Sequence, residues 1–394
     1  MATTGTAQAS SASSSRIESI DMVRGIAILL MIMGHSYDYL SYEAAAVMGA
    51  ASPLPLAMLN INATTASVFF NRWITHSGAP SFLYLAGVGA YLWAHKGGVQ
   101  RSLTGFLIPR GLLLIALQLT RTVMQLFTSK YPASLDVLWS IGMSMILLSF
   151  FSRLPRRILL FLSVVILAGH GLPAVLGFNG EGNVLWQVFM TADTFGFVGG
   201  TSIFNRFPVI PWFGMMLLGY ATGHLFLMPL KQRKNVFLFL GLALFAVFLI
   251  MRLANIYGYQ PLWQEYPETW KTVASFVNIS KYPPSLYFSL VALGTIFILF
   301  FCIDFFSLRY LFLINIGSTS LFIYILHLPL CKVIAVSLSR FLNYFDWPVS
   351  RDIYFSLQSS HLIAIVAFVI IYPISRLYLI LKRNNRNVKI LNYL

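Results

Sequence analysis

The stretch DMVRGIAILLMIMGHSYDYL, residues 21–40, has the oily middle of a membrane helix but carries Asp21, Arg24, His35 and Asp38. At about 100° per residue, positions 21, 24, 28, 31, 35 and 38 fall on one face of a helix. Charged groups at bilayer depth are costly and usually face a protein interior or a wet cavity. We therefore predict that this helix lines a polar pocket inside a membrane protein.

The composition of the chain agrees with a membrane location. Of its 394 residues, 58% are hydrophobic and 10% are charged, whereas a soluble domain is about 45–50% apolar and about 25% charged. The net charge of +15 fits the enrichment of Lys and Arg in cytoplasmic loops. This positive charge does not indicate nucleic-acid binding, because the sequence has no polar domain with a basic patch interleaved with aromatic residues.

Apolar segments of about 20 residues, enough to cross a hydrocarbon core of about 30 Å, recur along the chain. The ten predicted spans are 18–41, 72–94, 106–128, 134–152, 157–174, 208–228, 235–253, 282–303, 310–338 and 359–380. With both termini inside, the inner segments carry about twice as many Lys and Arg as the outer ones. The prediction is an all-α polytopic membrane protein with about ten transmembrane helices and both termini cytoplasmic. Span 310–338 is long and contains Pro329, so we expect a kink or a split there.

The predicted domain organisation is simple. Residues 1–15 are small and polar, and they indicate a disordered tail rather than a signal peptide. Residues 16–381 form a single transmembrane domain, and 382–394 form a basic cytoplasmic tail. Cys302 and Cys331 lie in apolar segments without metal-ligand spacing, so we predict small buried hydrophobes, no disulfide and no metal site.

The stripe on the first helix predicts one through-going cavity that joins the two sides of the membrane, with an anion site toward the cytoplasm and a general base toward the outside. Arg24 and His35 are eleven residues apart, or about 16 Å along a helix axis. Arg24 would bind an anion toward the cytoplasm, together with Asp21. Histidine has an unperturbed pKa near 6.5 and suits a general base, and Asp38, about one turn beyond His35, is expected to orient its imidazole. The alternative for these groups is a buried ion pair with neighbouring helices.

Further polar residues occur in other spans. Arg72 and His76 lie one turn apart near the outer end of the second span, where His35 and His76 are expected to bracket the mouth of one pocket. The candidate catalytic residues are therefore His35, His76 and Asp38. The remaining candidates are Arg24, Arg110 and Asp21 for the anionic ligand, and Arg72, Arg121, Gln118, Asp136 and His327 for the substrate pocket. His327 has the alternative of a satisfied core histidine.

Several stretches together resemble a known family. Arg24 and His35 match the arginine–histidine signature in the first helix of acyltransferase type 3 membrane enzymes. The chain more closely resembles bacterial relatives of the heparan-α-glucosaminide N-acetyltransferase catalytic domain, in order, from residue 16 to about 340. The matching stretches are SIDMVRGIAILLMIMGH, ITHSGAPSFLYLAGVGAYL, PRGLLLIALQL, LWSIGMSMILL, FPVIPWFGMMLLGYATG, KYPPSLYFSLVALG and GSTSLFIYILHLPL.

The resemblance implies an enzyme of the bacterial inner (plasma) membrane that takes an acyl group from cytoplasmic acyl-CoA, by expectation acetyl-CoA. The acceptor would be the amine or hydroxyl of a sugar or glycan on the outer side. In the characterised lysosomal relative the catalytic histidine lies in the first outer loop. This chain has no histidine there, so the role would pass to His35 or His76. Relatives often have Glu where this chain has Gln118, which removes one candidate base.

Two other functions remain open at this point. A transporter of a small anion or sugar would also place charges inside the membrane, but the paired broken helices of inverted repeats are not evident. A structural or partner-binding protein would need no polar pocket, which disagrees with the polar cluster on the first three spans. A homodimer is also left open by the sequence.

Overall fold

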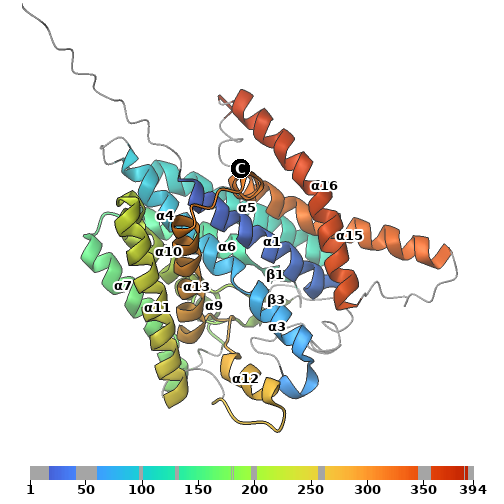
Figure 1. The fold of residues 1–394 in the computed structure, drawn as a ribbon, viewed down its shortest axis with the longest axis horizontal. Coiled ribbons are helices and arrows are strands. Elements are labelled where there is room, and N and C mark those ends of the chain that lie inside the picture. The colour runs from blue at the N-terminus through green and yellow to red at the C-terminus, as the bar shows by residue number, and fades with distance from the viewer. Residues whose placement is uncertain are drawn as a thin grey trace, which may run out of the picture.

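In the computed structural model the chain is mostly helical, as predicted (Figure 1). The structure describes residues 17–40, 60–96, 101–128, 133–178, 180, 182–196, 202–255, 262–344, 356–385 and 387–388. The helices are α1 (Glu18–Leu40), α3 (Ala66–Thr75), α4 (Gly78–Ala94), α5 (Thr104–Thr128), α6 (Val137–Phe151), α7 (Arg156–Gly169), α8 (Leu172–Val175), α9 (Val184–Phe189), α10 (Val209–Thr222), α11 (Leu230–Ala254), α12 (Thr269–Val277), α13 (Leu286–Phe305), α14 (Leu311–Ser318), α15 (Ser320–Tyr344) and α16 (Leu357–Asn384), with 3₁₀ turns η1 (Ile61–Ala63) and η3 (Gly223–Leu227). The predicted tail at 1–15 lies outside the described residues.

Within the described ranges, seven helices are long and apolar enough to cross a membrane. They are Glu18–Asp38, Thr104–Phe127, Val209–Leu227, Leu230–Ala254, Leu286–Phe305, Ser320–Phe341 and Leu357–Asn384. Each corresponds to one of the predicted spans. The other three predicted spans hold the shorter helices α4, α6 and α7, so ten crossings stay a prediction.

The predicted span 310–338 is split, but not at its proline. The break falls at Thr319, between α14 and α15, and Pro329 lies inside α15. The short α14 packs on the start of α1, where a Cβ built on Gly317 would stand 1.8 Å from the backbone oxygen of Asp21. The glycine therefore permits a backbone approach that any side chain would block.

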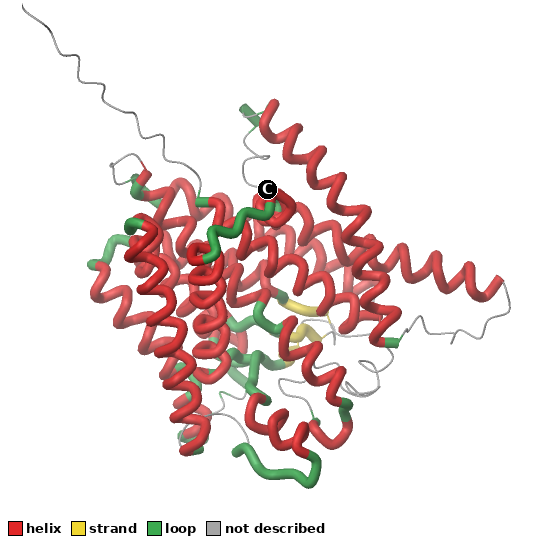
Figure 2. Tube along the Cα trace, viewed as in Figure 1, coloured by secondary structure: helices red, strands yellow, loops and turns green. Residues whose placement is uncertain are grey.

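A small sheet is a feature that the all-α prediction missed. Strands β1 (Ala133–Leu135), β2 (Thr194–Gly196) and β3 (Ser202–Asn205) are arranged in the order β1-β3-β2, with β1 parallel and β2 antiparallel to β3. The strands are yellow in Figure 2. Strands this short give no readable alternation in the sequence. The sheet fixes the start of α6 and the chain just before α10 at the same end of the bundle.

Contacts between loops agree with the predicted alternation of the spans. Two segments predicted to be outside, β1 and β3, pair with each other, and α3 packs against α12 at the lower end of Figure 1. Among segments predicted to be inside, Arg309 pairs with Glu18 and Arg233 pairs with Asp304. Which end faces the cytoplasm still rests on the positive-inside rule.

The core is centred on α4 and α10. A Cβ on Gly87 would lie 2.0 Å from the backbone oxygen of Met216, and one on Gly219 would lie 2.1 Å from that of Tyr84. The two backbones therefore touch, as small residues allow in membrane helix pairs. This contact holds α4 against α1, on the side of α1 that carries Arg24.

Candidate active site

Two cavities lie along the polar stripe of α1. Arg24 lines the first and His35 the second, whereas the sequence predicts one through-going cavity that both residues line. The cavities share Phe82, Val137 and Tyr324 in their linings. We call them the arginine cavity and the histidine cavity.

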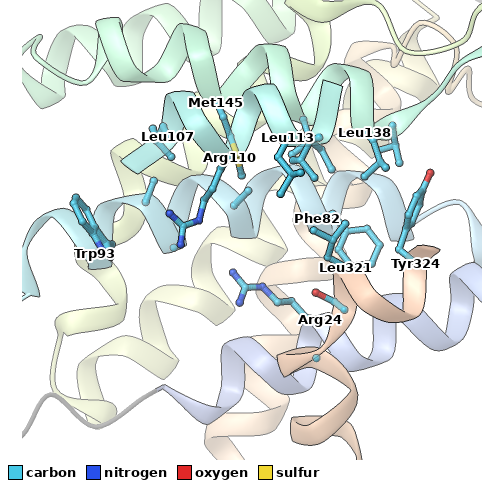
Figure 3. Close-up of a pocket in the computed structure, with 18 of the residues that line it drawn as sticks. Arg24, Phe82, Trp93, Leu107, Arg110, Leu113, Leu138, Met145, Leu321 and Tyr324 are labelled. Atoms are coloured by element: carbon cyan, nitrogen blue, oxygen red, sulfur yellow. The ribbon is translucent and has the colours of Figure 1, made fainter. Parts of the chain in front are cut away.

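The arginine cavity has a volume of about 440 Å³ and mostly apolar walls. Its cationic lining consists of Arg24, Arg110 and Lys382, from three separate helices. Figure 3 shows the guanidinium groups of Arg24 and Arg110 pointing into it, with Trp93 at one end and Phe82, Leu321 and Tyr324 at the other. Guanidinium groups bind phosphate oxygens through a fork of donors, so this cavity suits a phosphorylated ligand with an apolar portion.

The two arginines of this cavity are held in place by neighbouring groups. Arg24 donates to the backbone oxygen of Leu85 at 3.1 Å, and its Nη1 lies 3.6 Å from Oδ1 of Asp21. Asp21 is buried and stands behind Arg24 rather than in the cavity lining. The guanidinium of Arg110 lies 3.8 Å from the ring centroid of Phe106. Asp21, predicted to take part in ligand binding, is thus placed to orient Arg24 and does not itself line the cavity.

The aromatic end of the arginine cavity is preorganised. The rings of Trp93 and Phe106 stack at 4.0 Å between centroids with 17° between their planes. Arg101 lies 5.8 Å from the Trp93 ring, so this end combines aromatic faces with two arginines.

Lys382 lies within α16, which continues to Asn384. The predicted domain boundary at 382 therefore falls inside a helix.

The histidine cavity is small, about 50 Å³, and its lining is much more polar. The polar side chains in its lining are His35, Asp38, Thr75, His76, Arg121, Asp136, Arg206, Lys281, Tyr282 and Tyr324. All three residues predicted to be catalytic are among them. Arg121 and Asp136, which were predicted for the substrate pocket, also line this cavity.

The protonation of His35 follows from its hydrogen bonds. Nδ1 of His35 lies 2.8 Å from Nε2 of His327, and Nδ1 of His327 lies 2.7 Å from the backbone oxygen of Tyr324. A carbonyl only accepts, so Nδ1 of His327 carries the proton and its Nε2 accepts when the ring is neutral. His35 then donates from Nδ1, and its Nε2 is the basic nitrogen. His327 is therefore placed to orient the His35 imidazole through this hydrogen bond. The same role for Asp38, which also lines the cavity, stays a prediction.

The second histidine has a different setting. Nε of Arg72 donates to Nε2 of His76 at 3.3 Å. Because arginine has no acceptor, the lone pair of His76 is directed at Arg72 and the ring proton is on Nδ1. Arg72 is 5% exposed and contacts His76 from behind the lining. Of the two histidines, His35 has the arrangement of a general base.

One carboxylate holds two arginines in the wall of the histidine cavity. Asp136 forms ion pairs with Arg121 and with Arg206, the latter at 3.5 Å, and accepts from the hydroxyl of Ser134 at 2.9 Å. Gln118 lies outside the cavity lining and donates to the backbone oxygen of Ser134 at 3.0 Å. Gln118 thus supports strand β1 and, through it, the position of Asp136.

Lys281 lies in the loop before α13, outside the membrane-spanning helices, and is buried in the cavity wall. Burial lowers the pKa of its ammonium to about 7, with attraction to Asp38 acting in the opposite sense and repulsion by Arg72 and Arg206 adding to the decrease. Lys281 is therefore poised between its two protonation states near neutral pH.

Five charged or tyrosine residues of the two linings were not predicted as site residues: Arg206, Lys281, Tyr282, Tyr324 and Lys382. A signal existed for three of them, because Lys281, Tyr282 and Tyr324 lie in the stretches that carry the family resemblance. Arg206 follows β3, a strand too short to be recognised in the sequence. Over the part of the chain that the structure describes, no group of three or more His, Cys, Asp or Glu residues gathers in a way that could hold a metal. That the protein needs no metal stays a prediction.

Comparison with known proteins gives one match. A family model described as heparan-alpha-glucosaminide N-acetyltransferase, catalytic, matches residues 16–252, which is more than half of the chain. No curated protein matches the chain. The matched region contains Arg24, His35, His76, Arg110 and Asp136. Lys281, Tyr324 and His327 lie beyond it, so the resemblance of the stretches after residue 252 stays a prediction.

Proposed function

The chain belongs to the heparan-α-glucosaminide N-acetyltransferase catalytic family, and from this premise we propose that it transfers an acetyl group from acetyl-CoA to an amine or hydroxyl of a sugar. One observation carries the proposal: the arginine cavity and the histidine cavity adjoin at Phe82, Val137 and Tyr324. A donor in the first can therefore present its acyl group to an acceptor in the second. Neither the family match nor the described residues support the transport alternative.

The donor would bind in the arginine cavity. Arg24, Arg110 and Lys382 supply positive charge for the phosphates of CoA, and the guanidinium fork suits phosphate geometry. The apolar wall between them suits the pantetheine chain. The thioester would then lie at the end formed by Phe82 and Tyr324, next to the histidine cavity.

The reaction we propose is direct transfer. The acceptor amine or hydroxyl attacks the thioester carbonyl carbon and gives its proton to Nε2 of His35. A C–N or C–O bond forms, the C–S bond breaks, and CoA leaves as the thiolate, which takes the proton back from His35. Adjacent cavities support direct transfer, because donor and acceptor can be bound together.

The positive groups of the histidine cavity would hold the acceptor. Arg121 and Arg206 are fixed by Asp136 and line the cavity, so they place positive charge where we propose that the sugar oxygens bind. Asp38 and His76 supply acceptor and donor groups on the opposite side. We propose that this cavity faces the outside of a bacterial inner membrane and the arginine cavity faces the cytoplasm, in line with the positive-inside rule. A homodimer stays a prediction.

The first test is the thermal stability of the purified protein with acetyl-CoA, CoA or ATP. A ligand that binds only the folded state raises stability by mass action. We expect stabilisation by acetyl-CoA and CoA and none by ATP, and a loss of this effect in Arg110→Gln but not in Arg157→Gln, which changes an exposed arginine outside the cavity. Equal stabilisation of the two variants would contradict the assigned donor site.

A further inference from the structure

A third cavity lies beside the histidine cavity and has a volume of about 200 Å³. Its lining is almost entirely apolar: Ile26, Leu30, Trp73, Ile74, His76, Ser77, Ile279, Phe288, Val291, Ala292, Thr295 and Leu299. We call it the side cavity. It lies between α1, α13 and the end of α3, and His76 lines both it and the histidine cavity.

The position of the side cavity indicates contact with lipid. Both α1 and α13 are long and apolar enough to span a membrane, so the cavity between them lies at the level of the hydrocarbon. Ile74, at its edge, is 52% exposed. Along α13 the lining extends from Phe288 to Leu299, which is about 16 Å at 1.5 Å per residue. The cavity thus has the chemistry and the length to hold a hydrocarbon chain.

The polar groups at the inner wall of the side cavity limit the kind of ligand that could carry this hydrocarbon chain. His76 is the shared residue, and behind it Arg72 brings a positive charge. Beyond His76 the histidine cavity offers the arginines held by Asp136. A ligand that fills both spaces needs an apolar tail and a polar head joined at His76.

We propose that the acceptor is amphiphilic: a sugar with a hydrocarbon tail, whose tail occupies the side cavity while its amine or hydroxyl reaches His35. This inference rests on the proposed function, because it identifies the class of acceptor for the same reaction. It predicts that the acceptor enters from the membrane, between α1 and α13, rather than from the aqueous side.

The test compares two acceptors with the same head: dodecyl β-D-glucosaminide and methyl β-D-glucosaminide, with the protein in lipid nanodiscs and acetyl-CoA as donor. We expect the KM of the dodecyl compound to be at least tenfold lower. Thr295→Phe, which fills the side cavity, should remove this advantage and leave the KM of the methyl compound unchanged. Cys302→Phe is the matched control, because it adds the same ring two turns along α13, outside the lining.

The control also corrects for partition of the dodecyl compound into the bilayer, which affects both variants equally. Stabilisation by acetyl-CoA reports that each variant is folded, and Ala292→Leu is a second filling variant on the same wall. Equal KM values of the dodecyl compound in Thr295→Phe and Cys302→Phe would overturn the inference but leave the proposed function intact.

Binding is also measured without turnover. Dodecyl glucosaminide should raise the melting temperature of the wild type and Cys302→Phe, and it should not do so for Thr295→Phe. Equal shifts in all three proteins would overturn the inference whether or not acetylation is seen. If acetyl-CoA does not stabilise the wild type, the result would instead overturn the proposed function.

Discussion

Nδ1 of His35 and Nε2 of His327 lie 2.8 Å apart, although 292 residues separate them in the chain. The carbonyl of Tyr324 fixes the proton of His327 on Nδ1. The basic nitrogen of His35 is consequently Nε2. A backbone carbonyl on α15 thus determines which atom of an α1 side chain is able to take a proton.

His35→Ala should lower kcat for acetyl transfer by about 10²–10⁴, the usual contribution of a general base. Stabilisation by acetyl-CoA should be unchanged, because His35 does not line the arginine cavity. The assay follows acetylated glucosaminide by mass spectrometry. His170→Ala is the control, since His170 lies outside both cavities and bonds to the backbone oxygen of Ile166. Full activity of His35→Ala would remove this residue from the mechanism.

His327 acts through His35, so its substitution should affect kcat and spare KM. His327→Leu removes the acceptor for Nδ1 of His35, and we expect kcat to fall about tenfold to a hundredfold, in the range reported for supporting residues. His327→Gln retains an acceptor oxygen and should recover part of the activity. The two variants are compared at saturating acetyl-CoA. If Gln and Leu give the same kcat, the role of His327 is packing rather than proton placement.

Tyr324 lines both cavities, and we expect its ring to keep water from the thioester. Tyr324→Ala should raise hydrolysis of acetyl-CoA in the absence of acceptor, relative to transfer, whereas Tyr324→Phe keeps the ring and should resemble the wild type. The measurement is release of CoA thiol with and without acceptor. Tyr310→Ala, at a side chain 49% exposed and outside both linings, is the control. An unchanged ratio in Tyr324→Ala would mean that another group forms the barrier.

The parts of the site that lie on one helix could be predicted from the sequence. The 3.6-residue period places Arg24 and His35 on one face of α1. The sequence predicts one cavity that joins them, whereas the structure has two adjoining cavities. The contact between His35 and His327 depends on the packing of α15 against α1, which no local pattern reports. Lys281 and Arg206 come from loops, and the position of Arg206 is fixed by a strand too short to recognise.

The break between α14 and α15 shows the same limit. The sequence predicts a kink or a split at Pro329, because proline removes a helix hydrogen bond. In the structure α15 continues through Pro329 and the helix breaks at Thr319. Gly317, two residues before the break, lies against the backbone of α1, and this tertiary contact is visible only once both helices are in place.

Lys281 gives a prediction for stability against pH. Burial lowers the pKa of its ammonium to about 7 in the folded protein, whereas an unfolded lysine titrates near 10.4. Between these values the unfolded state binds more protons, so stability should rise with pH from about 7 to about 10. Lys281→Met removes this contribution, and its melting temperature should rise less over that interval than that of the wild type.

The measurement is the melting temperature in nanodiscs at pH 7 and at pH 9.5. Lys231→Met is the matched control, since Lys231 is exposed and should leave the pH dependence of the wild type unchanged. A wild-type slope that is retained in Lys281→Met would show that Lys281 is charged in the folded protein throughout this range. In that case attraction to Asp38 outweighs burial, and Lys281 would bind the acceptor as a permanent cation.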